Sequence, residues 1–258
     1  MTAVSNSPLV NYTRISPNKT VNRNHAIDTI TIHCVAGQCT VETLGAVFAP
    51  TSRRASSNYG IGKDGRIGMY VEEKDRSWCS SNAANDNRAI TIECASDTKA
   101  PFAINAKVYA ALVLLCADIC LRNGIKELKW KGDKSLIGQI DKQNMTVHKW
   151  FANKDCPGEY IYSRLGRIAE EVNSILRNKK AASPDEIEEF KPFTVRVDID
   201  DLNIRTGPGT NYSKVGIYTG RGTFTIMETR PGKGSTEGWG RLKSGAGWIS
   251  LDFAKRIE

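Results

Sequence analysis

Strict alternation of apolar and polar residues marks two stretches of the chain as strands. Residues 28–35 read DTITIHCV, with isoleucines and a cysteine on one face and threonines and His33 on the other. Residues 88–95, RAITIECA, repeat this alternation and carry Glu93 on the polar face. Because successive side chains of a strand point to opposite faces, both segments are predicted as strands. His33 and Glu93 therefore lie near strand ends, on the more polar faces.

Three further elements are expected in this part of the chain. Asp64-Gly65 predicts a hairpin turn between strands at residues 58–62 and 67–71. This reading excludes the G-x-G-x-x-G match at residues 60–65 as a dinucleotide site, since that fingerprint needs a helix opening within it. Helical spacing predicts a helix at 106–123, ended by Gly124, and a second helix at 160–177.

The composition changes after the second predicted helix. Residues 178–192 are polar, charged and contain two prolines, which is typical of a linker. From residue 193 to 258, short β-rich runs alternate with glycines and predict a small β-barrel. The chain is therefore divided into a domain at 1–177, a linker at 178–192 and a second domain at 193–258.

Composition narrows the class of protein. The chain has 258 residues, 40% of them hydrophobic, and no apolar run of about eighteen residues, so membrane insertion is not expected. The N-terminus lacks the basic start and apolar core of a secretory signal, so synthesis in the cytoplasm without export is expected. The net charge of +8 is spread along the chain and suits an anionic partner: nucleic acid, lipid or bacterial cell wall.

The cysteines do not form a disulfide framework, because seven is an odd number and no export signal is visible. Four of them lie in apolar segments and are expected as small core residues: Cys34, Cys94, Cys116 and Cys120. Cys39 and Cys79 receive no role.

The stretch TVHKWFANKDCPG, residues 146–158, contains both a histidine and a cysteine. With His33, the pair His148 and Cys156 supplies the three ligands that a catalytic zinc usually takes. A second interpretation makes Cys156 a nucleophile that His148 deprotonates. A third leaves both residues structural. Spacing alone does not decide among the three.

Four pieces in order resemble one family: IDTITIHC, SNYGIGKDGRI, NRAITIEC and VHKWFANKDCPG. They look like the zinc N-acetylmuramoyl-L-alanine amidases of type 2, which share their fold with peptidoglycan recognition proteins. The residues of these pieces are most similar to those of endolysins and autolysins of clostridia and their phages. The resemblance implies an α/β fold, a mixed central sheet flanked by helices, that acts on bacterial peptidoglycan and not on nucleic acid.

The resemblance also implies residue roles. His33, His148 and Cys156 occupy the positions of the ligands to one Zn²⁺, and Lys154 matches a lysine that steadies the developing oxyanion. Tyr59 matches a tyrosine near the metal in the phage branch, and Glu93 matches the general base of another branch. Which of these two moves the proton stays open. Two further residues are predicted as substrate contacts: Asn58 and Trp78.

LNIRTGPGTNYSKVG, residues 202–216, resembles the bacterial SH3-like domains of cell-wall enzymes. That family binds peptidoglycan peptides or cross-bridges, and a tethered binding module raises the effective concentration of an enzyme at its polymer. The candidate wall contacts are Arg205, Tyr212, Trp239 and Trp248.

The sequence therefore predicts a two-domain cell-wall hydrolase that accumulates in the cytoplasm and reaches the wall through a membrane lesion. Two rival functions are a non-catalytic peptidoglycan-binding protein and a thiol amidase that uses Cys156 with His148.

Overall fold

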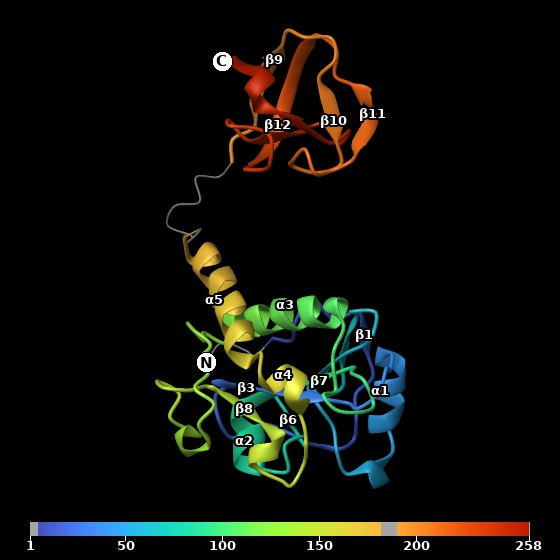
Figure 1. Ribbon diagram of the computed structural model, residues 1–258, viewed down its shortest axis with the longest axis vertical. Coiled ribbons are helices and arrows are strands. Elements are labelled where there is room, and N and C mark those ends of the chain that lie inside the picture. The colour runs from blue at the N-terminus through green and yellow to red at the C-terminus, as the bar shows by residue number, and fades with distance from the viewer. Residues whose placement is uncertain (1–4, 182–189, 258) are drawn as a thin grey trace. The chain divides into compact units, whose positions relative to one another are not determined.

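A six-stranded sheet organises the first of the two units into which the chain divides (Figure 1). The computed structural model describes residues 5–181 and 190–257. In spatial order the strands are β1 (Tyr12–Thr13), β5 (Ile67–Met69), β4 (Tyr59–Ile61), β7 (Ala89–Cys94), β3 (Thr29–Cys34) and β8 (Met145–Val147). Only β4 and β5 pair antiparallel, which makes the sheet mixed, as predicted. A separate two-stranded ladder joins β2 (Lys19–Thr20) to β6 (Arg76–Ser77).

Helices flank this sheet. Figure 1 shows α3 (Ala106–Arg122) and α5 (Leu165–Ala181) on one side and α2 (Ala83–Arg88) on the other. The remaining helices are α1 (Val41–Phe48), α4 (Gly158–Tyr162) and the 3₁₀ turns η1 (Thr51–Arg53), η2 (Lys134–Leu136) and η3 (His148–Trp150). Among the residues that the structure describes, no helix combines the length and hydropathy that a membrane span requires.

The two faces of the sheet differ in chemistry. Isoleucines of β3 and β7 pair across the ladder, Ile30 with Ile90 and Ile32 with Ile92, and all four are fully buried in the core under α3 and α5. Burying such a side chain stabilises the fold by about 1.5–3 kcal/mol. The opposite face carries the threonines of the same strands and, at the strand ends, His33 opposite Glu93.

Buried hydroxyls and one amide connect the elements on the polar face. Thr31 on β3 and Thr146 on β8 are joined through their hydroxyls at 2.7 Å. The side chain of Asn85 on α2 donates to Thr31 at 3.0 Å and accepts from Thr146 at 2.9 Å. Because an unsatisfied buried polar group costs about 1–3 kcal/mol, this closed set fixes α2 against the two strands.

The predicted hairpin is present. Gly65 adopts a positive φ of 86° in the turn between β4 and β5, a conformation that glycine reaches without strain. The helix predicted at 106–123 forms as α3, and Gly124 follows its last turn with a φ of 70°.

The helix predicted at 160–177 is instead two helices, α4 and α5. At the break, the Ser163 hydroxyl donates to the Glu159 carbonyl at 2.7 Å and Arg164 donates to the Tyr160 carbonyl at 3.0 Å. Side chains that bond nearby carbonyls compete with helix continuation. Helix α5 then extends through Ala181, four residues into the predicted linker, and residues 182–189 of that linker lie outside the described residues.

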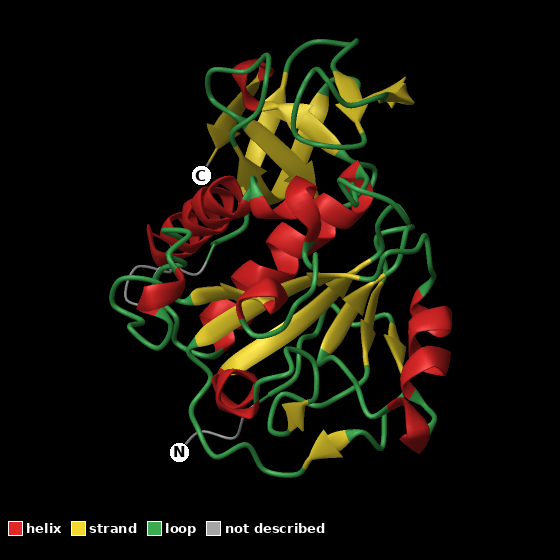
Figure 2. Cartoon of the chain, turned by 60° about the horizontal axis from the view of Figure 1, so that its bottom comes forward, coloured by secondary structure: helices red, strands yellow, loops and turns green. Residues whose placement is uncertain are grey.

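The second unit is all-β, with antiparallel pairing throughout its described ladder, and consists mostly of strands and loops (Figure 2). In spatial order its strands are β11 (Lys214–Tyr218), β10 (Asn203–Arg205), β14 (Trp248–Ser250), β13 (Trp239–Leu242), β12 (Gly222–Arg230), β9 (Phe193–Val197) and β15 (Ala254–Ile257). A 3₁₀ turn, η5 (Leu251–Phe253), precedes β15. Its core is small and aliphatic, built from Val195, Val197, Leu202, Ile204, Ile226, Leu242 and Ile249.

Candidate functional site

Strand register brings the three predicted ligands together. Ile32 pairs with Val147 in parallel, so His33 and His148, the next residues on β3 and after β8, are neighbours. Cys156, from the loop before α4, places its Sγ 3.4 Å from His33 Nδ1. The ligand atoms of His33, His148 and Cys156 all lie within 4.8 Å of one another. These three residues are called the ligand cluster below.

Serine hydroxyls orient the two imidazoles. His33 Nε2 faces Ser80 Oγ at 3.5 Å, and Ser80 in turn accepts from the Asn85 amide at 3.1 Å. His148 Nε2 faces Ser81 Oγ at 3.1 Å. With a proton on Nε2 of His33, the Nδ1 lone pair faces the cluster, which is how outer partners fix a ligating histidine. The polar network under the sheet therefore reaches the ligand cluster.

Burial keeps the histidines neutral, as metal ligation requires. Desolvation, and secondarily the nearby His148, lowers the pKa of His33 to about 3. Desolvation and then Lys154 lower the pKa of His148. Two neutral imidazoles and a cysteine sulfur form a donor set that fits Zn²⁺, because zinc takes nitrogen and sulfur ligands and a catalytic site keeps one position open.

Glu93 lies directly beside the cluster, paired with His33 across the β3–β7 ladder. Its carboxyl group is buried: Oε1 is 3.8 Å from the Cys79 thiol, and Oε2 has no hydrogen-bond partner among the described residues. Desolvation, with a smaller contribution from Cys34, raises the pKa of Glu93 to about 8. His33, Cys79 and Glu93 also have their ligand atoms within 4.8 Å of one another. A desolvated carboxyl group at this position is suited to proton transfer near neutral pH.

A cavity of about 370 Å³ opens beside the cluster. It is lined by His148, by the predicted Lys154 and Trp78, and by residues that the sequence analysis did not single out for the site: Arg53, Arg54, Ala55, Arg76, Cys79, Ser81, Asn82, Ala83 and Asp86. The Thr20 hydroxyl accepts from Arg76 at 2.6 Å and from the Trp78 indole at 2.9 Å, which fixes both side chains on the rim. Four cationic side chains therefore surround the cavity.

Two predicted residues do not reach the cluster. Tyr59 pairs with Ile92, so it points to the opposite face of the sheet from Glu93. Its hydroxyl donates to Glu73 at 2.7 Å and accepts from the Ser7 amide at 2.9 Å. Asn58 is fully buried, and its side chain accepts from the Thr91 amide at 3.2 Å. The expectations that Tyr59 lies near the metal and that Asn58 touches substrate are corrected accordingly.

The candidate wall contacts of the second unit include both buried and exposed side chains. Trp239 and Trp248 are 2% and 9% exposed, so both indoles are packing residues and not a displayed surface. Tyr212 is 43% exposed. Arg205 is half-buried and donates to the Tyr212 carbonyl at 2.7 Å.

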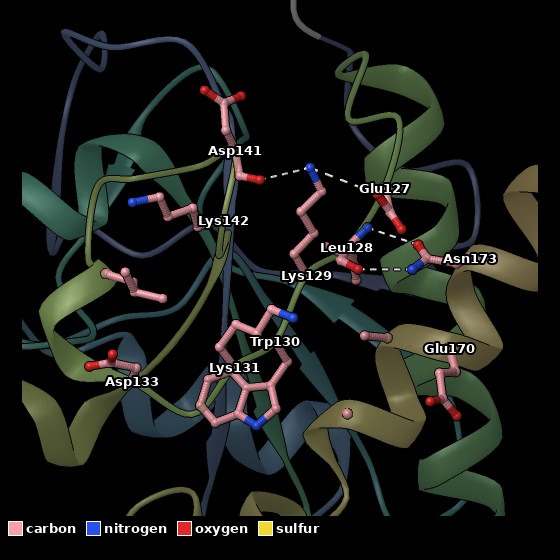
Figure 3. A pocket seen from close by; sticks show the side chains of 13 residues that line it. Glu127, Leu128, Lys129, Trp130, Lys131, Asp133, Asp141, Lys142, Glu170 and Asn173 are labelled. Atoms are coloured by element: carbon pink, nitrogen blue, oxygen red, sulfur yellow. Dashed lines mark hydrogen bonds and ion pairs between the residues drawn. The ribbon is translucent and has the colours of Figure 1, made fainter.

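A larger cavity of about 790 Å³ lies away from the ligand cluster (Figure 3). Trp130 forms part of its wall, and Lys129 reaches across it to the Asp141 carbonyl at 3.0 Å. The Trp130 indole stacks on Trp150, with ring centres 5.1 Å apart and planes 6° apart. Trp150 is the last residue of η3, which begins at the ligand His148. Trp130 therefore links the wall of this cavity to the turn that contains His148.

Comparison with known sequences identifies the class. Residues 23–159 match the N-acetylmuramoyl-L-alanine amidase family. The match covers more than half of the chain, and the chain belongs to this family. A comparison with curated proteins finds no match.

Solved structures with similarity to the chain include two amidases or endolysins and a related protein. A mutant endolysin from Bacillus subtilis is 17% identical, with a TM-score of 0.45, covering 63% of this chain and 99% of its own. A selenomethionine derivative of AmpD is 18% identical, with a TM-score of 0.49 and coverage of 66% and 99%. The amidase LysC from Clostridium intestinale is 18% identical, with a TM-score of 0.41 and coverage of 65% and 95%. At this identity the similarity concerns the fold alone.

The position of Tyr59 generates a first prediction. Tyr59→Phe removes a buried hydroxyl that two groups share, so unfolding in urea should show a loss of about 1–3 kcal/mol. Because the hydroxyl lies on the far face of the sheet, kcat should stay within about twofold of the wild type. Tyr70→Phe, which removes another buried hydroxyl bond, to the Val41 carbonyl, is the matched control. A large fall in kcat at unchanged stability would contradict this placement and indicate that Tyr59 takes part in the reaction.

The raised pKa of Glu93 generates a second prediction, for protein stripped of metal. Between pH 4.5 and about 8 the unfolded state has released this proton while the folded state retains it, so folding loses stability as pH rises. Glu93→Gln removes this dependence. Its Tm should exceed that of the wild type by a margin that widens from pH 4.5 to 8 and vanishes at lower pH. A margin independent of pH would show that the carboxyl group is already ionised.

Proposed function

We propose that the first unit hydrolyses the amide bond between the lactyl group of N-acetylmuramic acid and L-alanine in bacterial peptidoglycan, as a zinc enzyme. The observation that carries this proposal is the ligand cluster with Glu93 beside it, in a chain of the amidase family. Separate elements supply the four side chains, namely β3, the turn after β8, the loop before α4, and β7.

His33, His148 and Cys156 would hold one Zn²⁺. When bound, the ion supplies a Lewis acid and lowers the pKa of a coordinated water to about 7. The buried His33 and the half-buried His148 favour this binding, because desolvation lowers the pKa of both imidazoles and no proton must leave them near neutral pH. The backbone at Cys156 is also fixed, because the Cys156 carbonyl accepts a hydrogen bond from the Lys149 amide at 3.0 Å.

Glu93 is the proposed general base and acid. It takes a proton from the attacking water and passes it to the leaving amine of L-alanine. A carboxyl group with its pKa near the working pH performs both transfers, because neither direction is strongly uphill. Positioned proton transfer contributes about 10²–10⁴-fold to a rate.

Lys154 is the proposed oxyanion partner. Its side chain is exposed and lines the cavity together with His148, so its ammonium group lies within reach of a carbonyl oxygen there. Preorganised positive charge stabilises an oxyanion more than it stabilises the neutral carbonyl, and this difference lowers the barrier.

The cationic rim is the proposed contact for the stem peptide. Stem peptides carry carboxylate groups, and Arg53, Arg54 and Arg76 surround the cavity with guanidinium groups that bind carboxylates in a bidentate way. Trp78, held by Thr20, offers an apolar surface beside them.

The second unit is proposed as an SH3-like wall-binding domain. The exposed Tyr212 and the half-buried Arg205 beside it are the remaining candidate contacts of the predicted four. The second unit would hold the enzyme at an insoluble polymer.

Metal removal tests the zinc proposal. Dialysis against a chelator should abolish release of stem peptides from purified cell wall, and one equivalent of Zn²⁺ should restore it. Mass spectrometry of the digest should show intact glycan strands and free peptides that begin with L-alanine. Activity that persists in metal-free protein would favour Cys156 as a nucleophile, and binding to the wall without any release would favour a non-catalytic role.

A variant of Glu93 tests the proton-transfer role. Glu93→Ala should keep about one zinc per chain and lower kcat by about 10²–10⁴-fold, since the ligands are untouched and the base is gone. Zinc content by elemental analysis is measured on the same preparation as turnover. Turnover equal to that of the wild type would assign the proton transfer to another group.

A further inference from the structure

A second cysteine lies next to the cysteine of the ligand cluster. Cys34 follows the ligand His33 at the end of β3, and its backbone amide donates to the Cys156 Sγ at 3.4 Å. Both residues are half-buried. Cys34 is not one of the three cluster ligands.

We propose that Cys34 and Cys156 form a reversible disulfide that removes Cys156 from the metal-ligand set. The inference rests on the proposed function, because it takes Cys156 as a zinc ligand. It assigns to Cys34 a role as the resolving cysteine of an oxidation site within the metal centre.

The reaction needs an oxidant, and a hydroperoxide is the class proposed. The Cys156 sulfur attacks one peroxide oxygen, the O–O bond breaks, the other oxygen leaves as water or an alcohol with the thiol proton, and Cys156 becomes a sulfenic acid. The Cys34 sulfur then attacks the Cys156 sulfur, the S–O bond breaks, and water leaves with the Cys34 proton. Two sulfurs lose one electron each, and the peroxide gains both.

The disulfide has a defined consequence for the metal. A thiolate, and not a disulfide sulfur, is the ligand that binds zinc. Oxidation would leave His33 and His148 as the remaining ligands of the cluster, and two imidazoles bind zinc less tightly than three donors. A thiol reductant such as dithiothreitol would restore the thiolate by exchange.

Neighbouring cysteines differ in their contacts. The Cys79 thiol is directed to Glu93 at 3.8 Å, and Cys39 packs against the small apolar cluster of Leu44, Phe48 and Tyr70. Cys39 is therefore a matched control, because it is half-buried, close to Cys34 in sequence, and makes no hydrogen bond to Cys156.

Peptide mapping of the full-length zinc protein tests the pairing. Cys34 and Cys39 share one tryptic peptide, because no lysine or arginine lies between Arg23 and Arg53, so the mapping uses Cys39→Ser. After treatment with hydrogen peroxide, the peptide containing Cys34 should be linked to the peptide containing Cys156. The linked species should lose two hydrogen atoms in mass, and zinc release should accompany its formation, followed with a colorimetric chelator.

Recovery of zinc after reduction tests whether Cys34 acts as the resolving cysteine. After peroxide, dithiothreitol and fresh Zn²⁺ should return the metal to wild-type and Cys39→Ser protein. Cys34→Ser, without a resolving thiol, should oxidise further to sulfinic acid at Cys156 and recover about tenfold less zinc. Cys34→Ala repeats the measurement in case the serine disturbs folding.

Two results would overturn the proposal. One is peroxide-treated Cys39→Ser protein with no Cys34–Cys156 link, a result that needs no variant of Cys34. The other is equal zinc recovery by Cys34→Ser and the wild type. Because both readouts are sulfur bonding and metal content, they remain informative if amidase activity is absent.

Discussion

Parallel pairing aligns β3 with β7 and β8 so that all three strands end at one edge of the sheet. His33, Glu93 and His148 take their positions from this alignment alone, each at or just beyond a strand end. A shift of one residue in either ladder would turn the corresponding side chain to the isoleucine face. The apolar core under α3 and α5, by selecting which face is buried, therefore also selects which residues meet at the ligand cluster.

Burial has opposite effects on the groups it gathers. It holds the two histidines neutral, which prepares them as ligands, and it holds the Glu93 carboxyl group protonated to higher pH, which costs stability once the pH exceeds its usual pKa. The polar network of Thr31, Thr146 and Asn85 offsets part of this cost by satisfying its own groups and by carrying Ser80 to His33. Stability and chemistry are thus coupled through the same face of the sheet.

Much of the fold was predictable because its strands alternate cleanly and its hairpin and helix ends carry glycine. The faces of β4 were less predictable: both sides of that strand are buried, so alternation does not reveal that Tyr59 points away from Glu93. Trp239 and Trp248 were predicted as wall contacts, because a tryptophan at a strand position does not by itself reveal that its indole is buried. The apolar stripe continues across the break at Ser163, which is why one helix was expected where two form.

The candidate site was predictable only in its chemically distinctive members. The ordered motifs named His33, Glu93, His148, Lys154 and Cys156. Arg53, Arg54 and Arg76 lie in irregular segments where a charged residue is ordinary, so only the closed fold reveals that they share a cavity. Ser80 and Ser81 were not predictable either, because the sequence does not show that their hydroxyls face the imidazoles of His33 and His148.

The stacked pair Trp130 and Trp150 gives the ligand-bearing turn an optical signature. Two indoles that lie nearly parallel at 5.1 Å couple electronically, and Trp150 is two residues from His148. Near-ultraviolet circular dichroism of the unlabelled protein would therefore report the position of that turn in solution. The molecule carries its own probe for whether the second histidine stays in place when the cluster is emptied or filled.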